Sequence, residues 1–370
     1  MKDLLQSLAD GLNKPPEALP DQPILVYGAG SRGREVAAFL VDRGYDVLGF
    51  ADAAASGRDS WRQLRIRTLS DWQRETLPPS ATMVLAIHNH QVDMAALIND
   101  LGRSMVCRIV NPVEFQALFD GEFPAAYWLA GPGVYRGREA NLVRLDAVLA
   151  DEFSRDLLRR VVEFRLTGRY DVLPQPTPRE QYCPANLPRW RNPMRLVDGG
   201  AFVGDTLEQL QRNGYDFEQI VAFEPDPENY ARLSRRMRDM GPGVSGVCLP
   251  CGLGAQAELL RFASDGTGAS RVSQEGQQII QCVSIDDALP GMRPTLIKLD
   301  IEGGEPAALQ GAIQTITASR PALAISIYHH PHHLWEIPLL IDSWQLGYKL
   351  YLGVHGFSSF DLVLYGVPDE

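Results

Sequence analysis

Five acidic side chains follow predicted strands in the second half of this 370-residue chain. Asp198 and Asp205 stand around the end of the first strand, Glu224 ends the second, and Asp300 and Glu302 end the fourth. Because the carboxyl ends of parallel strands open onto one crevice, we expect these carboxylates to converge there. Two carboxylates about 4 Å from a phosphate would each cost about 4 kcal/mol at an effective dielectric of 20, which disfavours a pyrophosphate ligand. A ligand that carries a cation and a ribose is favoured instead.

A glycine-rich loop joins the first of these strands to a helix, and its small residues let a ligand approach the backbone closely. The loop reads Asp198-Gly199-Gly200-Ala201-Phe202-Val203-Gly204-Asp205-Thr206. Glu224, followed by Pro225, is placed to accept both hydroxyls of a ribose. S-adenosylmethionine has the sulfonium, the ammonium and the ribose that these groups favour. Taken singly, each acid has an alternative role as a helix cap or a first-turn charge.

His329 is the candidate base. It follows a predicted strand at residues 322–328 and should therefore emerge at the same edge as Asp300. A neutral imidazole there would take a proton from a reacting hydroxyl. A substrate contact, a metal ligand and a helix-entry residue are its alternative roles. Asp300 and Glu302 have the oxygen ligands that Mg²⁺ prefers, so a magnesium site is a second possibility, although we assign no metal from the sequence.

The elements that position these groups predict a doubly wound α/β unit at residues 195–370, with helices after Val203, Pro227, Gly304 and Pro331. Its strands are expected at residues 196–198, 220–224, 245–249, 296–300, 322–328, 348–352 and 360–365. A meander at 259–262 and 278–285 interrupts the alternation. Cys248 and Cys251 form a C-x-x-C pair without a following redox helix, so we expect Cys251 and Gly252 to border an adenine pocket.

A second glycine-rich loop lies near the N-terminus. Gly28, Gly30 and Gly33 fit the G-x-G-x-x-G pattern between a strand at 23–26 and a helix. Asp52 lies 19 residues after Gly33, where a ribose acid belongs, and Arg32 suits a phosphate at a helix N-terminus. With further strands at 46–50, 83–87 and 105–110, residues 1–112 are expected to form a smaller Rossmann-like nucleotide-binding domain. A purely structural unit is the alternative.

Residues 113–194 lack the strand–helix alternation of the two α/β domains. They have predicted helices at 140–149 and 152–166 and a proline-rich arm from 173 to 178. We interpret this segment as a helical bridge between the two α/β domains. Tyr182, on the arm, either closes over a cofactor or packs against the domain.

The composition excludes several classes of protein. The net charge of −11 disfavours nucleic acid and anionic lipid as partners. Five cysteines are too few for a disulfide framework, and no run of about 18 apolar residues predicts a membrane span. The N-terminal 20 residues lack the features of a signal peptide, so a cytoplasmic location is expected. Whether the protein forms a homo-oligomer is not determined by the sequence.

Four blocks of sequence resemble the FkbM-type methyltransferases, over roughly residues 151–370. They lie at 196–207, 221–227, 296–312 (LIKLDIEGGEPAALQGA) and 326–338 (SIYHHPHHLWEIP). The resemblance implies the class I methyltransferase fold, S-adenosylmethionine as the cofactor and a hydroxyl as the acceptor. It implies cofactor roles for Asp198, Gly200, Gly204, Asp205, Thr206 and Glu224, and places Asp300 and Glu302 near the reacting centre. The segment at 24–52 is similar to nucleotide-binding domains found ahead of sugar acyltransferases.

The sequence thus predicts an S-adenosylmethionine-dependent O-methyltransferase whose acceptor is a sugar, a nucleotide-sugar, a glycan or a related metabolite. Two alternatives remain open. One is an NAD-dependent oxidoreductase or epimerase that uses the N-terminal domain. The other is a non-catalytic binding protein with a degenerate methyltransferase fold.

Overall fold

The structure, a computed structural model, describes residues 1–12, 18–56, 59–74, 77–104, 107–241, 243–263, 271–272 and 278–369. Contacts divide the chain into two compact units, each described here by itself. The first comprises Met1–Ala140, Leu157–Gln175 and Gly356–Phe360, and the second Asn141–Asp156, Pro176–His355 and Asp361–Glu370. The segment predicted as a bridge, 113–194, is divided between these units.

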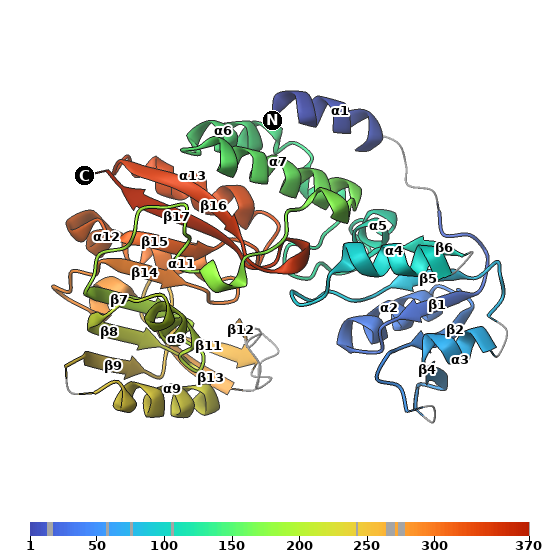
Figure 1. Ribbon diagram of the computed structural model, residues 1–370, viewed down its shortest axis with the longest axis horizontal. Coiled ribbons are helices and arrows are strands. Elements are labelled where there is room, and N and C mark those ends of the chain that lie inside the picture. The colour runs from blue at the N-terminus through green and yellow to red at the C-terminus, as the bar shows by residue number, and fades with distance from the viewer. Residues whose placement is uncertain are drawn as a thin grey trace. The chain divides into compact units, whose positions relative to one another are not determined.

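A six-stranded sheet forms the centre of the first unit, in the order β3-β4-β2-β1-β5-β6 (Figure 1). Its strands are β1 (Ile24–Tyr27), β2 (Val47–Ala51), β3 (Ser60–Trp61), β4 (Leu64–Arg67), β5 (Thr82–Leu85) and β6 (Arg108–Val110). Every pair is parallel except β3 with β4. The apolar residues of β1 and β5 are buried on both faces, which is typical of parallel strands between helices. Residues 105 and 106 of the predicted last strand lie outside the described residues.

The helices of the first unit follow its strands, apart from one N-terminal helix that precedes them. They are α1 (Lys2–Leu12), α2 (Ser31–Asp42), α3 (Leu69–Arg74), α4 (Met94–Ser104) and α5 (Pro112–Leu118). On α2, Val36, Ala37 and Leu40 are buried at helical spacing. The chain then continues into α6 (Glu139–Val148) and α7 (Glu152–Thr167), close to the two predicted bridge helices.

The second unit contains a seven-stranded sheet in the order β16-β17-β15-β14-β7-β8-β9 (Figure 1). Its strands are β7 (Met194–Gly199), β8 (Phe217–Phe223), β9 (Ser245–Leu249), β14 (Leu296–Leu299), β15 (Ala322–Ser326), β16 (Tyr348–Val354) and β17 (Leu362–Pro368). The strands from β15 to β9 pair in parallel, and β17 is antiparallel to both of its neighbours. The predicted α/β fold of the methyltransferase-like kind is confirmed.

Helices and a smaller sheet complete this unit. The helices are α8 (Asp205–Arg212), α9 (Pro227–Asp239), α10 (Ile285–Ala288), α11 (Glu305–Gln310), α12 (Ile313–Ser319) and α13 (His333–Ser343). The predicted meander is a four-stranded sheet of β10 (Gly252–Leu253), β13 (Gln278–Val283), β11 (Glu258–Ala263) and β12 (Arg271–Val272). Among the described residues, no helix has the length and apolar character needed to cross a membrane.

Candidate active site

The glycine-rich loop after β7 lies directly against the ends of the neighbouring strands. Gly200 has a φ of +70°, and a Cβ at this position would lie 1.9 Å from the carbonyl oxygen of Asp300. The amides of Gly200 and Ala201 both donate to the carbonyl of Phe223, at 3.1 and 3.0 Å. Only glycine meets both demands at position 200, because it has no Cβ and tolerates a positive φ. The loop is therefore tied to β8 and β14 before any ligand binds.

A buried ion pair between two strands of the sheet holds the loop in place. Lys298 of β14 stands opposite Asp198 of β7, and its Nζ lies 2.9 Å from the Asp198 carboxylate. The same ammonium donates to the carbonyls of Gly199 and Gly200, at 3.1 and 2.7 Å. Both charged side chains are almost completely buried. Asp198 thus faces Lys298, and the direct cofactor contact predicted for it finds no support in this geometry.

Glu224, just past the end of β8, connects the loop to the start of α9. One of its carboxylate oxygens accepts from the amide of Phe202 and the other from the amide of Asp226, both at 2.8 Å. Asp226 in turn caps α9, in which Pro227 stands in the first turn. Burial raises the pKa of Glu224 to about 7, even though the two amides favour its ionised form.

A cleft opens at the carboxyl ends of these strands, with an empty volume of about 660 Å³ that includes the space open to solvent. Eight predicted site residues line it: Gly200, Phe202, Glu224, Pro225, Cys251, Gly252, Asp300 and Glu302. The remaining residues of the wall carry no recognisable pattern in the sequence: Phe223, Asn229, Leu253, Phe262, Ile280, Cys282, Ile301 and Gly304. Phe262, Ile280 and Cys282 come from the small sheet, where they are buried together.

Other predicted cofactor residues have supporting positions instead. Gly199 packs against Leu253 and Leu299, and Gly204, with a φ of +84°, precedes α8. Thr206 is buried in the first turn of α8, whereas Asp205 beside it is exposed. None of these residues is among those that line the cleft.

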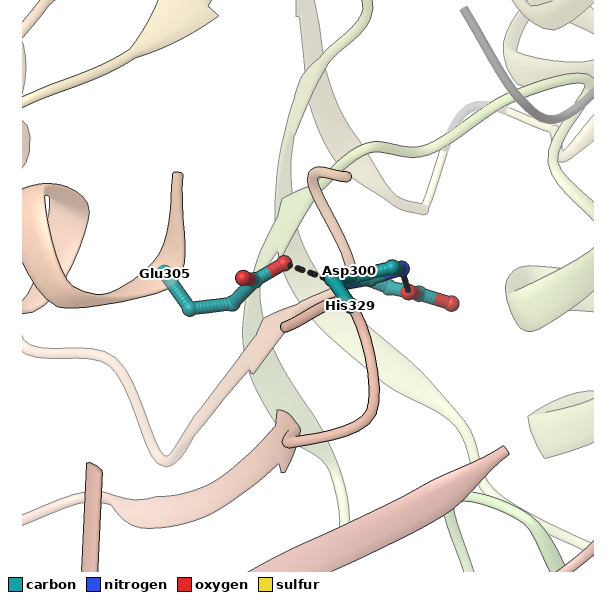
Figure 2. A group of neighbouring side chains, drawn as sticks. All are labelled: Asp300, Glu305 and His329. Carbon is teal, nitrogen blue, oxygen red and sulfur yellow. Dashed lines mark hydrogen bonds and ion pairs between the residues drawn. The ribbon is translucent and has the colours of Figure 1, made fainter. Parts of the chain in front are cut away.

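His329 does emerge at the same edge as Asp300, but among three carboxylates. Its Nε2 lies 3.2 Å from Asp300, and its Nδ1 lies 2.9 Å from Glu305 (Figure 2). The same Nε2 lies 3.7 Å from Glu302. Burial alone would lower the pKa of His329, but Glu305, Asp300 and Glu302 together raise it well above the usual 6.5. A protonated imidazole cannot accept a proton, so these surroundings do not favour the predicted neutral base.

The carboxylates around His329 are held in place by further contacts. Tyr182 of the arm donates to Asp300 at 2.9 Å, so the tyrosine packs on the acid that lines the cleft. Burial raises the pKa of Asp300, but His329, Lys298 and Tyr182 outweigh it and leave the pKa below its ordinary value. The site therefore keeps Asp300 ionised.

Glu305 is a site residue that the sequence pattern did not reveal, because it reads as an ordinary first-turn acid of a helix. It accepts from the amide of Ile301 at 2.8 Å and faces His329. Ligand atoms of Asp300, Glu305 and His329 all lie within 4.8 Å of one another, a spacing that could hold a metal ion. This set shares only Asp300 with the predicted magnesium pair.

The residues predicted to bind a nucleotide in the N-terminal domain form contacts within the protein itself. The carboxylate of Asp52 accepts from the amides of Ala29 and Ala54, at 2.7 and 2.9 Å. The guanidinium of Arg32 lies 4.3 Å from the Phe123 ring and donates to the carbonyl of Pro124. The groups predicted to bind ribose and phosphate thus have internal partners, and the nucleotide site stays a prediction.

Comparison with known proteins gives a family match over the part of the chain that contains the cleft. Residues 198–350 match the family model described as the methyltransferase FkbM domain. The predicted resemblance is thereby confirmed, and the match supports a methyltransferase. The matched residues include the glycine-rich loop after β7, the end of β8, the small sheet and the segment after β14, which line the cleft.

A solved structure is similar over the whole chain. It is methyltransferase FkbM from Methylobacillus flagellatus KT, with 22% sequence identity, 99% of each chain covered and a TM-score of 0.81. At this identity the likeness shows the fold alone, for both units. No curated protein matches the chain.

Proposed function

We propose that the chain is an S-adenosylmethionine-dependent O-methyltransferase that acts on a hydroxyl of a sugar, a nucleotide-sugar, a glycan or a related metabolite. One observation carries the proposal: the cleft of the FkbM domain places the Gly200 loop, Glu224 and Asp300 around one space. The sugar-type acceptor rests on the family resemblance.

The chemistry of the cleft fits this cofactor. Glu224 has lone pairs beyond the two that the backbone amides occupy, and these can accept ribose hydroxyls. Ionised Asp300 favours a cationic sulfonium or ammonium over a phosphate. Phe223, Leu253 and Ile280 give the apolar wall that an adenine ring needs. When bound, the cofactor supplies an electrophilic methyl group.

The protein's own part in methyl transfer is to align the acceptor and to take its proton. Because the surrounding carboxylates raise the pKa of His329 well above 6.5, we assign the proton to one of the two carboxylates that line the cleft, Asp300 or Glu302. His329 then acts as a positioning residue that holds both carboxylates in place. Tyr182, bonded to the other oxygen of Asp300, fixes the orientation of that carboxylate.

Thermal shift with S-adenosylmethionine, S-adenosylhomocysteine, NAD and a nucleotide-sugar tests the cofactor. A ligand at 100 times its Kd adds about 2.7 kcal/mol, which moves the midpoint of a domain of this size by about 2–4 °C. A shift with the two adenosyl ligands that is smaller in Glu224→Gln supports the proposal. A shift with NAD alone would favour the oxidoreductase. If neither adenosyl ligand causes a shift, the result would favour the non-catalytic binding protein.

Transfer of labelled methyl from the cofactor to a panel of free sugars, nucleotide-sugars and glycans tests the acceptor. Asp300→Asn and Glu302→Gln, compared under saturating cofactor, identify the proton acceptor as the residue whose loss lowers kcat more. Glu336, an exposed acid of α13, gives a matched control in Glu336→Gln.

A further inference from the structure

A second hollow opens at the opposite edge of the seven-stranded sheet. It lies where β7, β14 and β15 begin, and its walls include Arg195, Thr295 and Ala322 from those places. Its empty volume is about 1340 Å³. Arg195 borders the hollow and Gly200 borders the cleft, and the strand between them separates the two by about 16 Å at about 3.3 Å per residue. The hollow is therefore a separate place on the FkbM-bearing unit.

Cationic side chains dominate this hollow. The lining residues include six cations, Arg189, Arg191, Arg195, Arg293, Arg320 and Lys349, and one acid, Asp369. The chain as a whole carries a net charge of −11, so this concentration of positive charge runs against its composition. A concave surface of one sign focuses the field and attracts ions of the opposite sign.

The protein itself engages three of the six cations. Arg195 lies 3.2 Å from Glu218, and Lys349 lies 2.9 Å from Asp369. Arg189 donates to two backbone carbonyls beyond the hollow. These contacts leave the positive charge of the hollow only partly balanced.

Arg191, Arg293 and Arg320 are different. All three are exposed, and no carboxylate among the described residues forms an ion pair with them. They come from three separate segments: the stretch before β7, the stretch before β14 and the end of α12. A guanidinium group binds phosphate oxygens in pairs, so three groups around one hollow suit a ligand with several such oxygens.

We propose that this hollow binds a small anion with at least two phosphate groups, held by Arg191, Arg293 and Arg320. The largely buried Trp190 and the half-buried Tyr351 in the wall would contact an apolar part of such a ligand. A polynucleotide fits less well, because the net charge of the rest of the chain would repel its flanking phosphates. The site does not depend on the proposed methyl transfer, since it shares no residue with the cleft.

Isothermal titration of the full chain with inorganic pyrophosphate tests this site. We expect one binding event that weakens as salt increases. The triple variant Arg191→Gln, Arg293→Gln, Arg320→Gln should bind at least about tenfold more weakly, because each arginine gives charge-assisted hydrogen bonds. The matched control removes three exposed arginines of α9 in the same way, with Arg232→Gln, Arg235→Gln and Arg238→Gln, and should bind like wild type.

The remaining arms separate this site from the cleft and from a loss of folding. Saturating S-adenosylhomocysteine should leave pyrophosphate binding unchanged, whether or not S-adenosylhomocysteine itself binds to the protein. The single variant Arg293→Gln, with an unchanged circular dichroism spectrum, should show a smaller loss than the triple variant. Absence of pyrophosphate binding in wild type, equal binding by the triple variant, competition by S-adenosylhomocysteine, or tighter binding of a single-stranded oligonucleotide than of pyrophosphate would each overturn the proposal.

Discussion

The pH dependence of S-adenosylhomocysteine binding tests the role given to Glu224. Burial raises the pKa of this side chain to about 7, so its ionised fraction falls from about 0.9 at pH 8 to about 0.1 at pH 6. If the ionised carboxylate alone accepts the ribose hydroxyls, the apparent Kd varies inversely with that fraction. The Kd should therefore rise about tenfold from pH 8 to pH 6, which corresponds to about 1.4 kcal/mol.

The sign of this effect distinguishes it from a general loss of stability in acid. Because the pKa of Glu224 is higher in the folded than in the unfolded chain, the stability it contributes is fully present below the unfolded value of about 4.5. That contribution is lost as the pH rises through about 7. Acidification from pH 8 to pH 6 thus weakens ligand binding, whereas the contribution of Glu224 to the free energy of unfolding increases.

Isothermal titration in buffers between pH 6 and pH 8 measures the effect. Glu224→Gln removes the titrating group and should bind with a Kd that changes less than about twofold over the same range. Glu228→Gln, an exposed acid in the first turn of α9, should keep the wild-type slope. A wild-type Kd that stays constant from pH 8 to pH 6 would refute the role of the ionised carboxylate.

Three further predictions concern the loop and the cluster around His329. Gly200→Ala puts a Cβ 1.9 Å from a carbonyl oxygen and should weaken S-adenosylhomocysteine binding more than tenfold, whereas Gly241→Ala, also at positive φ but in open space, should not. His329→Gln leaves buried carboxylates without their cation, so urea denaturation should show a loss of about 3–5 kcal/mol; an unchanged midpoint would contradict the imidazolium. Dialysis against EDTA should leave methyl transfer unchanged, since the proton of His329 already balances the cluster; activity lost and then restored by Mg²⁺ would show that an ion takes its place.

Local pattern predicted the strands and the edge of the sheet where the site lies. Three apolar runs of the sequence form strands of the sheet. The run that ends at Asp198 forms β7, the run that ends at Glu224 forms β8, and the run that precedes Asp300 forms β14. The prediction that His329 meets Asp300 is correct, because two parallel neighbouring strands end at the same edge. These expectations depend on hydrophobic periodicity and on one rule of topology.

The charge state of the site could not be predicted in this way. The pKa of His329 is raised chiefly because Glu305, at the start of α11, lies 2.9 Å from its Nδ1, and an acid in the first turn of a helix gives no sign of such a contact in the sequence. Lys298 reads as an ordinary polar residue within a strand, although it pairs with Asp198 across the sheet. Both contacts depend on which residues become neighbours in space, and spacing along one segment contains no such information.

The link between acid and loop appears in both units. Asp52 accepts from the amide of Ala29 as Glu224 accepts from the amide of Phe202, at 2.7 and 2.8 Å. Each acid is thus a tether for its glycine loop, whether or not a ligand is present. A substitution at Glu224 accordingly measures two quantities together, the preorganisation of the loop and the direct contact with the cofactor. Asp52→Asn tests the corresponding tether in the first unit.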